Sequence, residues 1–159
     1  MSGQPPLPGR VAGIDYGTVR IGIAVSNPER TIASPLENYT RRNLDQDAQR
    51  FRRLAADERI ALFVVGLPIH LDGGESQKST EARHFGQWLA ETTGIAVEFF
   101  DERFTSHEAE QFLLAAEMTR KRRKKRMDML AAQIMLSAYL ETRGEGRGTG
   151  GEGQMMNDE

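Results

Sequence analysis

The sequence predicts an α/β domain built on a mixed five-stranded sheet with helices on both faces. Two short apolar runs near the N-terminus alternate with small residues and are separated by a short turn, which indicates an antiparallel hairpin. A later run at residues 60–65, IALFVV, is continuously apolar and favours a strand covered on both faces. Amphipathic helical patterns precede the later strands, and the 159 residues are enough for one domain with its own core.

The N-terminal part of the chain predicts three strands in a meander. Residues 10–16 and 21–26 form the hairpin, with the turn GTVR between them. A third strand is expected at residues 31–39. Pro35 restricts this strand to a sheet edge or a bulge, because proline cannot donate to a sheet ladder.

Helices and strands then alternate along the rest of the chain. Helices are expected at residues 43–57, 77–93, 106–117 and 127–142, and strands at 60–65 and 95–100. Gly94 is expected to end the second helix, and Thr105 with Glu108 forms a capping box for the third. The order β-β-β-α-β-α-β-α-α is that of ribonuclease H-like domains, with later strands parallel to the first.

Composition sets the limits of the domain and excludes several classes of protein. We expect a flexible N-terminus at 1–9, a folded unit at 10–142 and a disordered Gly-rich tail at 143–159. The absence of cysteine excludes a disulfide scaffold, a thiol nucleophile and a thiolate zinc site. No apolar stretch is long enough to span a membrane, and the N-terminus lacks the apolar core of a signal peptide. The absence of cysteine also fits a reducing cytoplasm.

Basic charge is concentrated in one segment. The net charge is −2, but seven of the 21 Lys and Arg residues stand in succession at residues 120–126. The other 14 face 23 acidic residues, a net charge of −9. This basic run consists of Arg120, Lys121, Arg122, Arg123, Lys124, Lys125 and Arg126. Such a run is either a solvated loop or a contact for a polyphosphate backbone, and its density favours nucleic acid.

Three carboxylates could meet at one edge of the predicted sheet. Asp15 ends the first strand, and Glu102 follows the strand at 95–100. The C-terminal ends of parallel strands form the usual ligand crevice of such sheets, so these two should lie together. Asp128 begins the last predicted helix and shares a face with Ala131 and Ala132, which let that helix lie close to the sheet.

Three converging carboxylates repel one another unless a cation joins them, and hard oxygen ligands select Mg²⁺ or Mn²⁺. Such sites hydrolyse phosphodiesters with a metal-activated water. Taken singly, Asp15 could be a turn residue, Glu102 could pair with Arg103 or Arg20, and Asp128 could be a helix N-cap. Only the three together favour a metal site.

Four stretches carry a resemblance to a known family. They are GIDYGTVRIGIAVS at 13–26, VVGLP with the later DG at 64–73, DERFTSHEA at 101–109 and RMDMLAAQIMLSAYL at 126–140. The chain resembles the bacterial YqgF family, whose members are described as pre-16S rRNA nucleases or Holliday junction resolvases. The resemblance implies a ribonuclease H-like fold and metal-dependent hydrolysis of nucleic acid, with Asp15, Glu102 and Asp128 as the metal-binding, catalytic acids. It also implies maturation of the 16S rRNA 5′ end in the cytoplasm.

The chain departs from the family pattern at His70, where asparagine is frequent, and in the tail after residue 142. The leading hypothesis is a nuclease in which the basic run binds the backbone and Arg20 or Arg103 steadies the scissile phosphate. The alternatives are a resolvase of four-way DNA, a nucleotide-binding module of the actin and sugar-kinase type, and a non-catalytic nucleic-acid-binding domain. Length argues against the nucleotide-binding module, and both monomer and homodimer are left open.

Overall fold

The computed structural model describes residues 9–68, 76–102 and 120–148, and within the last range it gives only the backbone of 120–128 and 144–148. The strands are β1 (Arg10–Asp15), β2 (Arg20–Ser26), β3 (Ala33–Thr40), β4 (Ile60–Leu67) and β5 (Ala96–Asp101). The helices are α1 (Leu44–Asp57), α2 (Gln77–Thr93) and α4 (Arg120–Gly148). The predicted helix at 106–117 lies outside the described residues.

The strands form one mixed sheet in the order β3-β2-β1-β4-β5. Strands β1, β2 and β3 pair antiparallel, while β4 is parallel to both β1 and β5. This topology confirms the predicted meander and the parallel later strands. Pro35 lies on the edge strand β3, and the pairing with β2 shifts register between Ile23 and Ala24, so the expected edge and bulge occur together.

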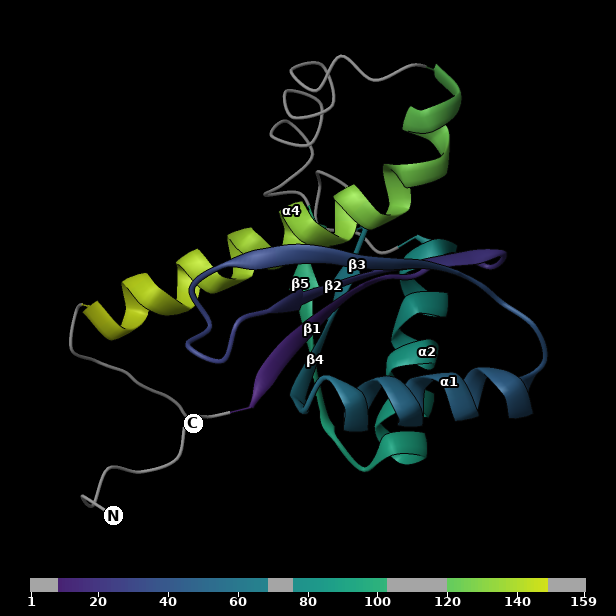
Figure 1. The fold of residues 1–159 in the computed structure, drawn as a ribbon, viewed down its shortest axis with the longest axis horizontal. Coiled ribbons are helices and arrows are strands. Elements are labelled where there is room, and N and C mark those ends of the chain that lie inside the picture. The colour runs from purple at the N-terminus through teal and green to yellow at the C-terminus, as the bar shows by residue number, and fades with distance from the viewer. Residues whose placement is uncertain (1–8, 69–75, 103–119, 149–159) are drawn as a thin grey trace.

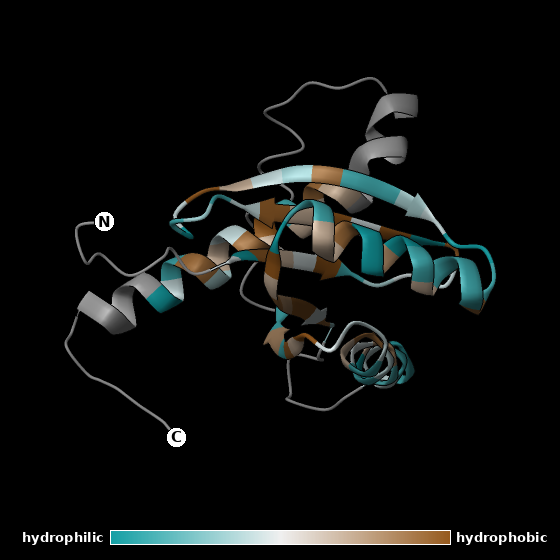
Figure 2. Cartoon of the chain, turned by 60° about the horizontal axis from the view of Figure 1, so that its bottom comes forward, coloured by the Kyte–Doolittle hydropathy of each residue, from teal (hydrophilic) through white to brown (hydrophobic). Residues whose placement is uncertain are grey.

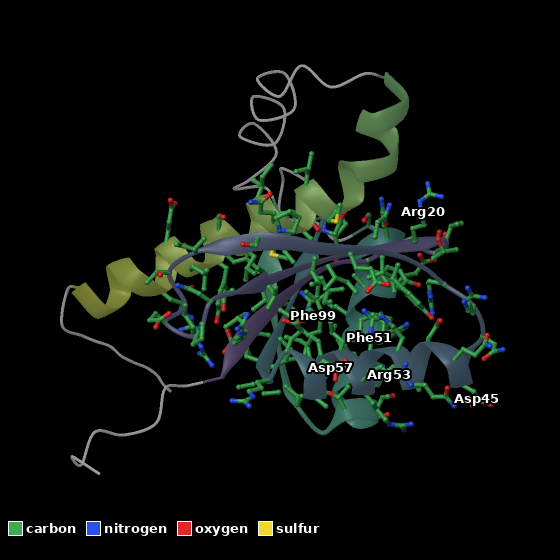
Figure 3. The ribbon with its side chains drawn as sticks, in the orientation of Figure 1. Arg20, Asp45, Phe51, Arg53, Asp57 and Phe99 are labelled. Atoms are coloured by element: carbon green, nitrogen blue, oxygen red, sulfur yellow. The ribbon has the colours of Figure 1, made fainter. Side chains whose placement is uncertain are left out.

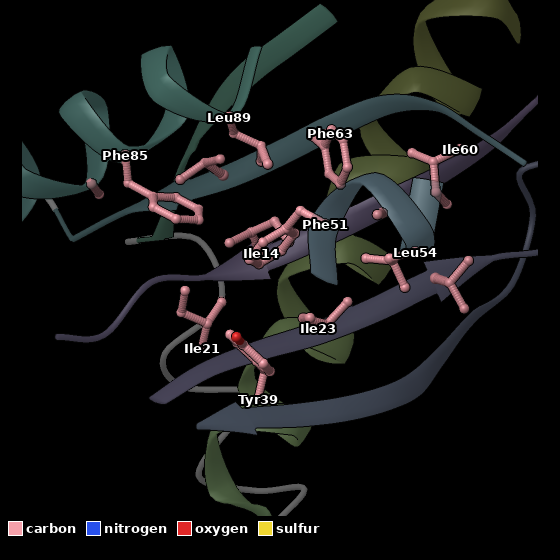
Figure 4. Close-up of a cluster of buried hydrophobic side chains, with 14 of the residues drawn as sticks. Ile14, Ile21, Ile23, Tyr39, Phe51, Leu54, Ile60, Phe63, Phe85 and Leu89 are labelled. Atoms are coloured by element: carbon pink, nitrogen blue, oxygen red, sulfur yellow. The ribbon is translucent and has the colours of Figure 1, made fainter. Parts of the chain in front are cut away.

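The sheet is covered on both faces, as predicted (Figure 1). Helices α1 and α2 pack on one face over a cluster that includes Ile14, Phe51, Phe63 and Leu89, all fully buried (Figure 4). Helix α4 crosses the other face over a second, smaller cluster. The hydrophobic residues concentrate in the inner strands, whereas the outer side of α1 is largely hydrophilic (Figure 2).

Local capping fixes the ends of α1 and α2. The Asn43 side chain accepts a hydrogen bond from the Gln46 amide at 2.8 Å, and Ser76 accepts from the Ser79 amide at 3.1 Å. Gly94 ends α2 in the left-handed region at φ 74°. The predicted helices at 43–57 and 77–93 are therefore confirmed almost to the residue.

Helix α4 is longer than the sequence predicts. It begins at Arg120 instead of residue 127 and ends at Gly148 instead of residue 142. The basic run thus has a helical backbone and is not a loop, and Asp128 lies inside the helix, so the N-cap interpretation of Asp128 is wrong. Once residues 130–140 dock on the sheet, adding helical residues costs little, and Lys and Arg are good helix formers. In the part of the chain that the structure describes, no helix is long and apolar enough to cross a membrane.

Candidate active site

Asp15 lines a cavity at the C-terminal end of β1. The cavity has a volume of about 390 Å³. It is lined by Asp15, Tyr16, Gly17, Thr18, Val19, Arg20, Lys78 and Glu81. The first six come from the end of β1 and the turn into β2, and the last two from the first turns of α2, so the cavity is a cleft between this hairpin and α2.

Glu102 lies directly over β4. A Cβ atom added to Gly66 would be 2.8 Å from the Glu102 Cγ and 2.9 Å from its Cδ, so only glycine leaves room for this side chain. Burial raises the pKa of Glu102; the positive charge of Lys78 works against that rise, and the negative charge of Asp101 adds to it. The carboxylate is therefore held where a nearby cation would favour its ionised form.

The two acids project from the same face of the sheet. Along β1, Ile14 packs in the cluster under α1 and α2, so strand alternation places Asp15 on the α4 face. Along β4, Val65 packs in the same cluster, so Gly66 faces α4. Because Ile14 pairs with Val65, the next step of this register brings Asp15 level with Gly66, the residue that Glu102 covers. The structure thus brings Asp15 and Glu102 together at the C-terminal ends of the strands, on the face of the sheet that α4 crosses.

Asp128 lies on the helix that crosses this face. A Cβ added to Gly13 would be 2.9 Å from the Leu136 Cβ and 3.3 Å from the Ala132 carbonyl oxygen, so α4 touches β1 here. The turns after Leu136 line a second cavity near the start of β4. From Leu136 back to Ala132, α4 therefore runs towards the C-terminal end of β1. Asp128 lies one helical turn before Ala132. Its side chain is outside the described residues.

The described cations of the cleft are Arg20 and Lys78. Both are exposed, and Arg20 lies at the end of the sheet, apart from Arg53 and Asp57 on α1 (Figure 3). Sequence reasoning selected Arg20 and missed Lys78, because nothing in the sequence places the first turn of α2 beside the end of β1.

The remaining predicted site residues are less well defined. Arg103 lies outside the described residues, as does His70, and the basic run is described by its backbone alone. Among the side chains that the structure describes, no three His, Cys, Asp or Glu residues form a metal-ligand cluster.

The strand order and the helix layers define a domain of the ribonuclease H-like fold. The family model described as "RuvX: Holliday junction resolvase" matches residues 9–142, and the chain belongs to this family. This confirms the resemblance carried by the four sequence stretches. The chain is accordingly a hydrolase, a nuclease acting on ester bonds.

Curated relatives and solved structures agree with this assignment. A protein of Rhodopirellula baltica is 52% identical over 136 residues, covering 86% of this chain and 79% of the relative. A protein of Koribacter versatilis is 40% identical over 136 residues, covering 86% and 89%. Both are named "Putative pre-16S rRNA nuclease".

Two solved structures show the same fold at low sequence identity. RuvC of T. thermophilus in complex with Holliday junction substrate is 17% identical with a TM-score of 0.54, covering 86% of this chain and 96% of RuvC. The fowlpox virus resolvase in complex with Holliday junction DNA is 10% identical with a TM-score of 0.53, covering 84% and 98%.

Proposed function

We propose that this protein is a divalent-metal-dependent nuclease that processes the 5′ end of pre-16S rRNA in the cytoplasm during ribosome biogenesis. The observation that carries the proposal is the placement of Asp15 and Glu102 on one face and one edge of the sheet, beside a cleft. The names of the curated relatives support rRNA as the substrate.

The donor set fits Mg²⁺ or Mn²⁺. Asp15, Glu102 and Asp128 would supply carboxylate oxygens, the ligands that hard cations prefer, and the chain has no cysteine to favour a softer metal. The burial of Glu102 fits as well, because a buried carboxylate is stabilised in its ionised form by a cation. A bound cation of this class lowers the pKa of a coordinated water and stabilises charge on the leaving oxygen.

The chain's own cations would position the nucleic acid. Arg20 and Lys78 stand on the two walls of the cleft, on the hairpin and on α2, so a phosphate entering between them meets positive charge from both sides. The basic run would hold backbone phosphates further along, and Arg103 would add to this binding surface. We expect such contacts to bind without reading base sequence.

A second candidate is cleavage of four-way DNA junctions, favoured by the description of the matching family model. Both substrates present a phosphodiester to the same three acids, so the chemistry proposed for the site is the same for either one. A resolvase must cut two strands, which would require a homodimer, whereas a monomer suffices to process an RNA end.

The test compares wild type with Asp15→Asn in the presence of Mg²⁺ or Mn²⁺. The substrates are a precursor 16S rRNA 5′ fragment and a synthetic four-way DNA junction. Asp57→Asn is the matched control, because Asp57 is an exposed carboxylate on α1, away from the cleft (Figure 3). We expect wild type and Asp57→Asn to cut the RNA, and Asp15→Asn to bind it without cutting.

Preferential cleavage of the junction would select the second candidate. Binding of RNA by all three proteins without any cleavage would contradict the nuclease proposal and leave a binding domain. If Asp15→Asn cut the RNA at the wild-type rate, Asp15 would not be a catalytic residue.

A further inference from the structure

Asp47 is a buried charge that the proposed reaction does not use. Its side chain is 1% exposed, in the first turns of α1. Tyr39 donates its hydroxyl to the Asp47 Oδ1 at 2.6 Å, and the Arg42 amide donates to the same oxygen at 2.9 Å. Arg41 donates Nε to the Oδ2 at 3.3 Å. Burial alone would raise the pKa of Asp47, but these hydrogen bonds and the charge of Arg41 lower it, so the carboxylate stays ionised.

The same guanidinium reaches the residue that follows Asp15. Arg41 donates its second nitrogen, Nη1, to the Tyr16 hydroxyl at 3.0 Å. The Arg41 Cζ lies 5.4 Å from the centre of the Tyr16 ring and 5.7 Å from that of Phe85. The Tyr16 and Phe85 rings are themselves 5.0 Å apart, so Tyr16 is held between α2 and Arg41.

The backbone of Arg41 holds the same segment at a second point. Its amide donates to the Val19 carbonyl at 2.9 Å. Between these two contacts, a Cβ at Gly17 would collide with the Arg20 carbonyl, so the turn is tight. One residue therefore fixes both ends of the turn that forms a wall of the cleft and begins directly after Asp15.

We propose that Arg41 is a positioning residue: anchored by the buried Asp47, it fixes Tyr16 and the turn to Val19, and so sets the place of the Asp15 carboxylate at the cleft. This inference rests on the proposed function for its catalytic consequence. Alternation of the strand places Tyr16 on the α2 face and Asp15 on the α4 face, so clamping one side chain fixes the backbone that carries the other.

Three variants test the proposal. Tyr16→Phe keeps the ring packing and removes only the acceptor of Arg41. Arg41→Lys keeps a charge beside Asp47 but cannot serve Asp47 and Tyr16 at once, because it lacks the forked donors of arginine. Tyr139→Phe is the matched control. It also removes a hydroxyl that accepts a hydrogen bond from an arginine, since Arg143 Nε donates to the Tyr139 hydroxyl at 3.0 Å. This pair lies near the opposite end of the sheet.

The readouts are kcat, KM, the Kd for RNA, the thermal midpoint, and amide hydrogen exchange at residues 17–19. We expect Tyr16→Phe to lower kcat by about 10-fold, since small misplacements of reacting groups are costly, with KM and Kd unchanged and faster exchange at 17–19. Arg41→Lys should do the same, and the double variant should be no slower than Arg41→Lys alone. Tyr139→Phe should lower the thermal midpoint and leave kcat unchanged.

Three results would overturn the proposal: unchanged exchange at 17–19 in Tyr16→Phe, a raised KM at constant kcat, or an equal loss of kcat in Tyr139→Phe. The second would make the Tyr16 hydroxyl a substrate contact, and the third would make the effect one of general stability. If the wild type cuts no nucleic acid, the proposed function fails alone, and the exchange measurement still decides whether Arg41 fixes this turn.

Discussion

Gly66 shows how a single missing side chain makes room for a candidate catalytic group. Glu102 occupies the space above the Gly66 Cα, on the face of the sheet that carries Asp15. Gly86 plays a comparable part on the other face, where a Cβ would be 2.6 Å from the Phe99 ring. The two glycines therefore offer the same substitution with different consequences, one at the candidate site and one in the core.

We predict that Gly66→Ala lowers cleavage by at least about 10-fold while the protein stays folded, because the methyl group displaces the Glu102 side chain. Gly86→Ala should instead lower the thermal midpoint by overpacking α2 against β5, at a cost of about 1–3 kcal/mol, with cleavage by the folded protein retained. Cleavage rates and thermal melts of both variants check this. If Gly66→Ala cut at the wild-type rate, cleavage would not require the Glu102 side chain to lie over residue 66.

At the scale of elements, α4 joins two functions of the chain in one continuous helix, whose first turns bend away from the part that lies on the sheet (Figure 1). Its middle part docks on β1, β2 and β3, where Gln133 also donates to the Ala33 carbonyl at 3.2 Å. Its first turns carry the basic run, and Asp128 lies between the two parts. Because the helix is continuous, docking of the apolar part keeps the backbone of the basic run close to the end of the sheet where Asp15 lies.

This continuity leads to a prediction for nucleic-acid binding. The double variant Lys124→Gln with Lys125→Gln should bind single-stranded RNA more weakly for every sequence tested. The slope of log Kd against log salt should fall by about 1.4, since each lost phosphate contact on a single strand removes about 0.7. Arg53→Gln, an exposed cation on α1, is the control and should keep the wild-type slope. An unchanged slope in the double variant would exclude these lysines from the interface.

At the scale of the whole molecule, two buried tyrosines link the packing of both sheet faces to pH. Burial and a hydrogen bond to Asp47 raise the pKa of Tyr39 to about 12, under α1. Burial and a hydrogen bond to Glu98 likewise raise the pKa of Tyr139 to about 12, under α4. Each phenol titrates near 10 when the chain unfolds, so the folded state favours the protonated form on both faces.

A tyrosine with a raised pKa contributes stability that is complete below pH 10 and is lost as the pH rises to about 12. We therefore predict that the free energy of unfolding from urea melts falls between pH 10 and 12. Tyr39→Phe and Tyr139→Phe should each reduce this fall, and comparison with wild type removes the contribution of lysines that titrate in the same range. If the free energy of unfolding fell equally between pH 10 and 12 in wild type and in both variants, neither tyrosine would have a raised pKa in the folded protein.

Much of the fold is predictable because it depends on local chemistry. The end of α2 at Gly94 and the edge position of Pro35 are predicted because each follows from the backbone of a single residue. The caps that the structure shows at Asn43 and Ser76 depend on single side chains in the same way. The antiparallel pairing of β1 with β2 follows from their short link, and the burial of β4 on both faces follows from its continuous apolar run. The start of α4 could not be predicted this way, because neighbouring like charges disfavour a helix locally, and only docking of the distant part of α4 explains its extension.

The candidate site likewise has features that the sequence predicts and features that only the packing of the chain decides. The sequence by itself determined the family, the strand-end positions of Asp15 and Glu102, and the apolar face that continues from Asp128, because these depend on periodicity and motif. Only the tertiary structure decided that Lys78 shares a cleft with Asp15, that Glu102 rests on Gly66, and that Arg41 joins Asp47 to Tyr16. These contacts join side chains far apart in the sequence, and their existence depends on how helices and strands pack, which no local pattern encodes.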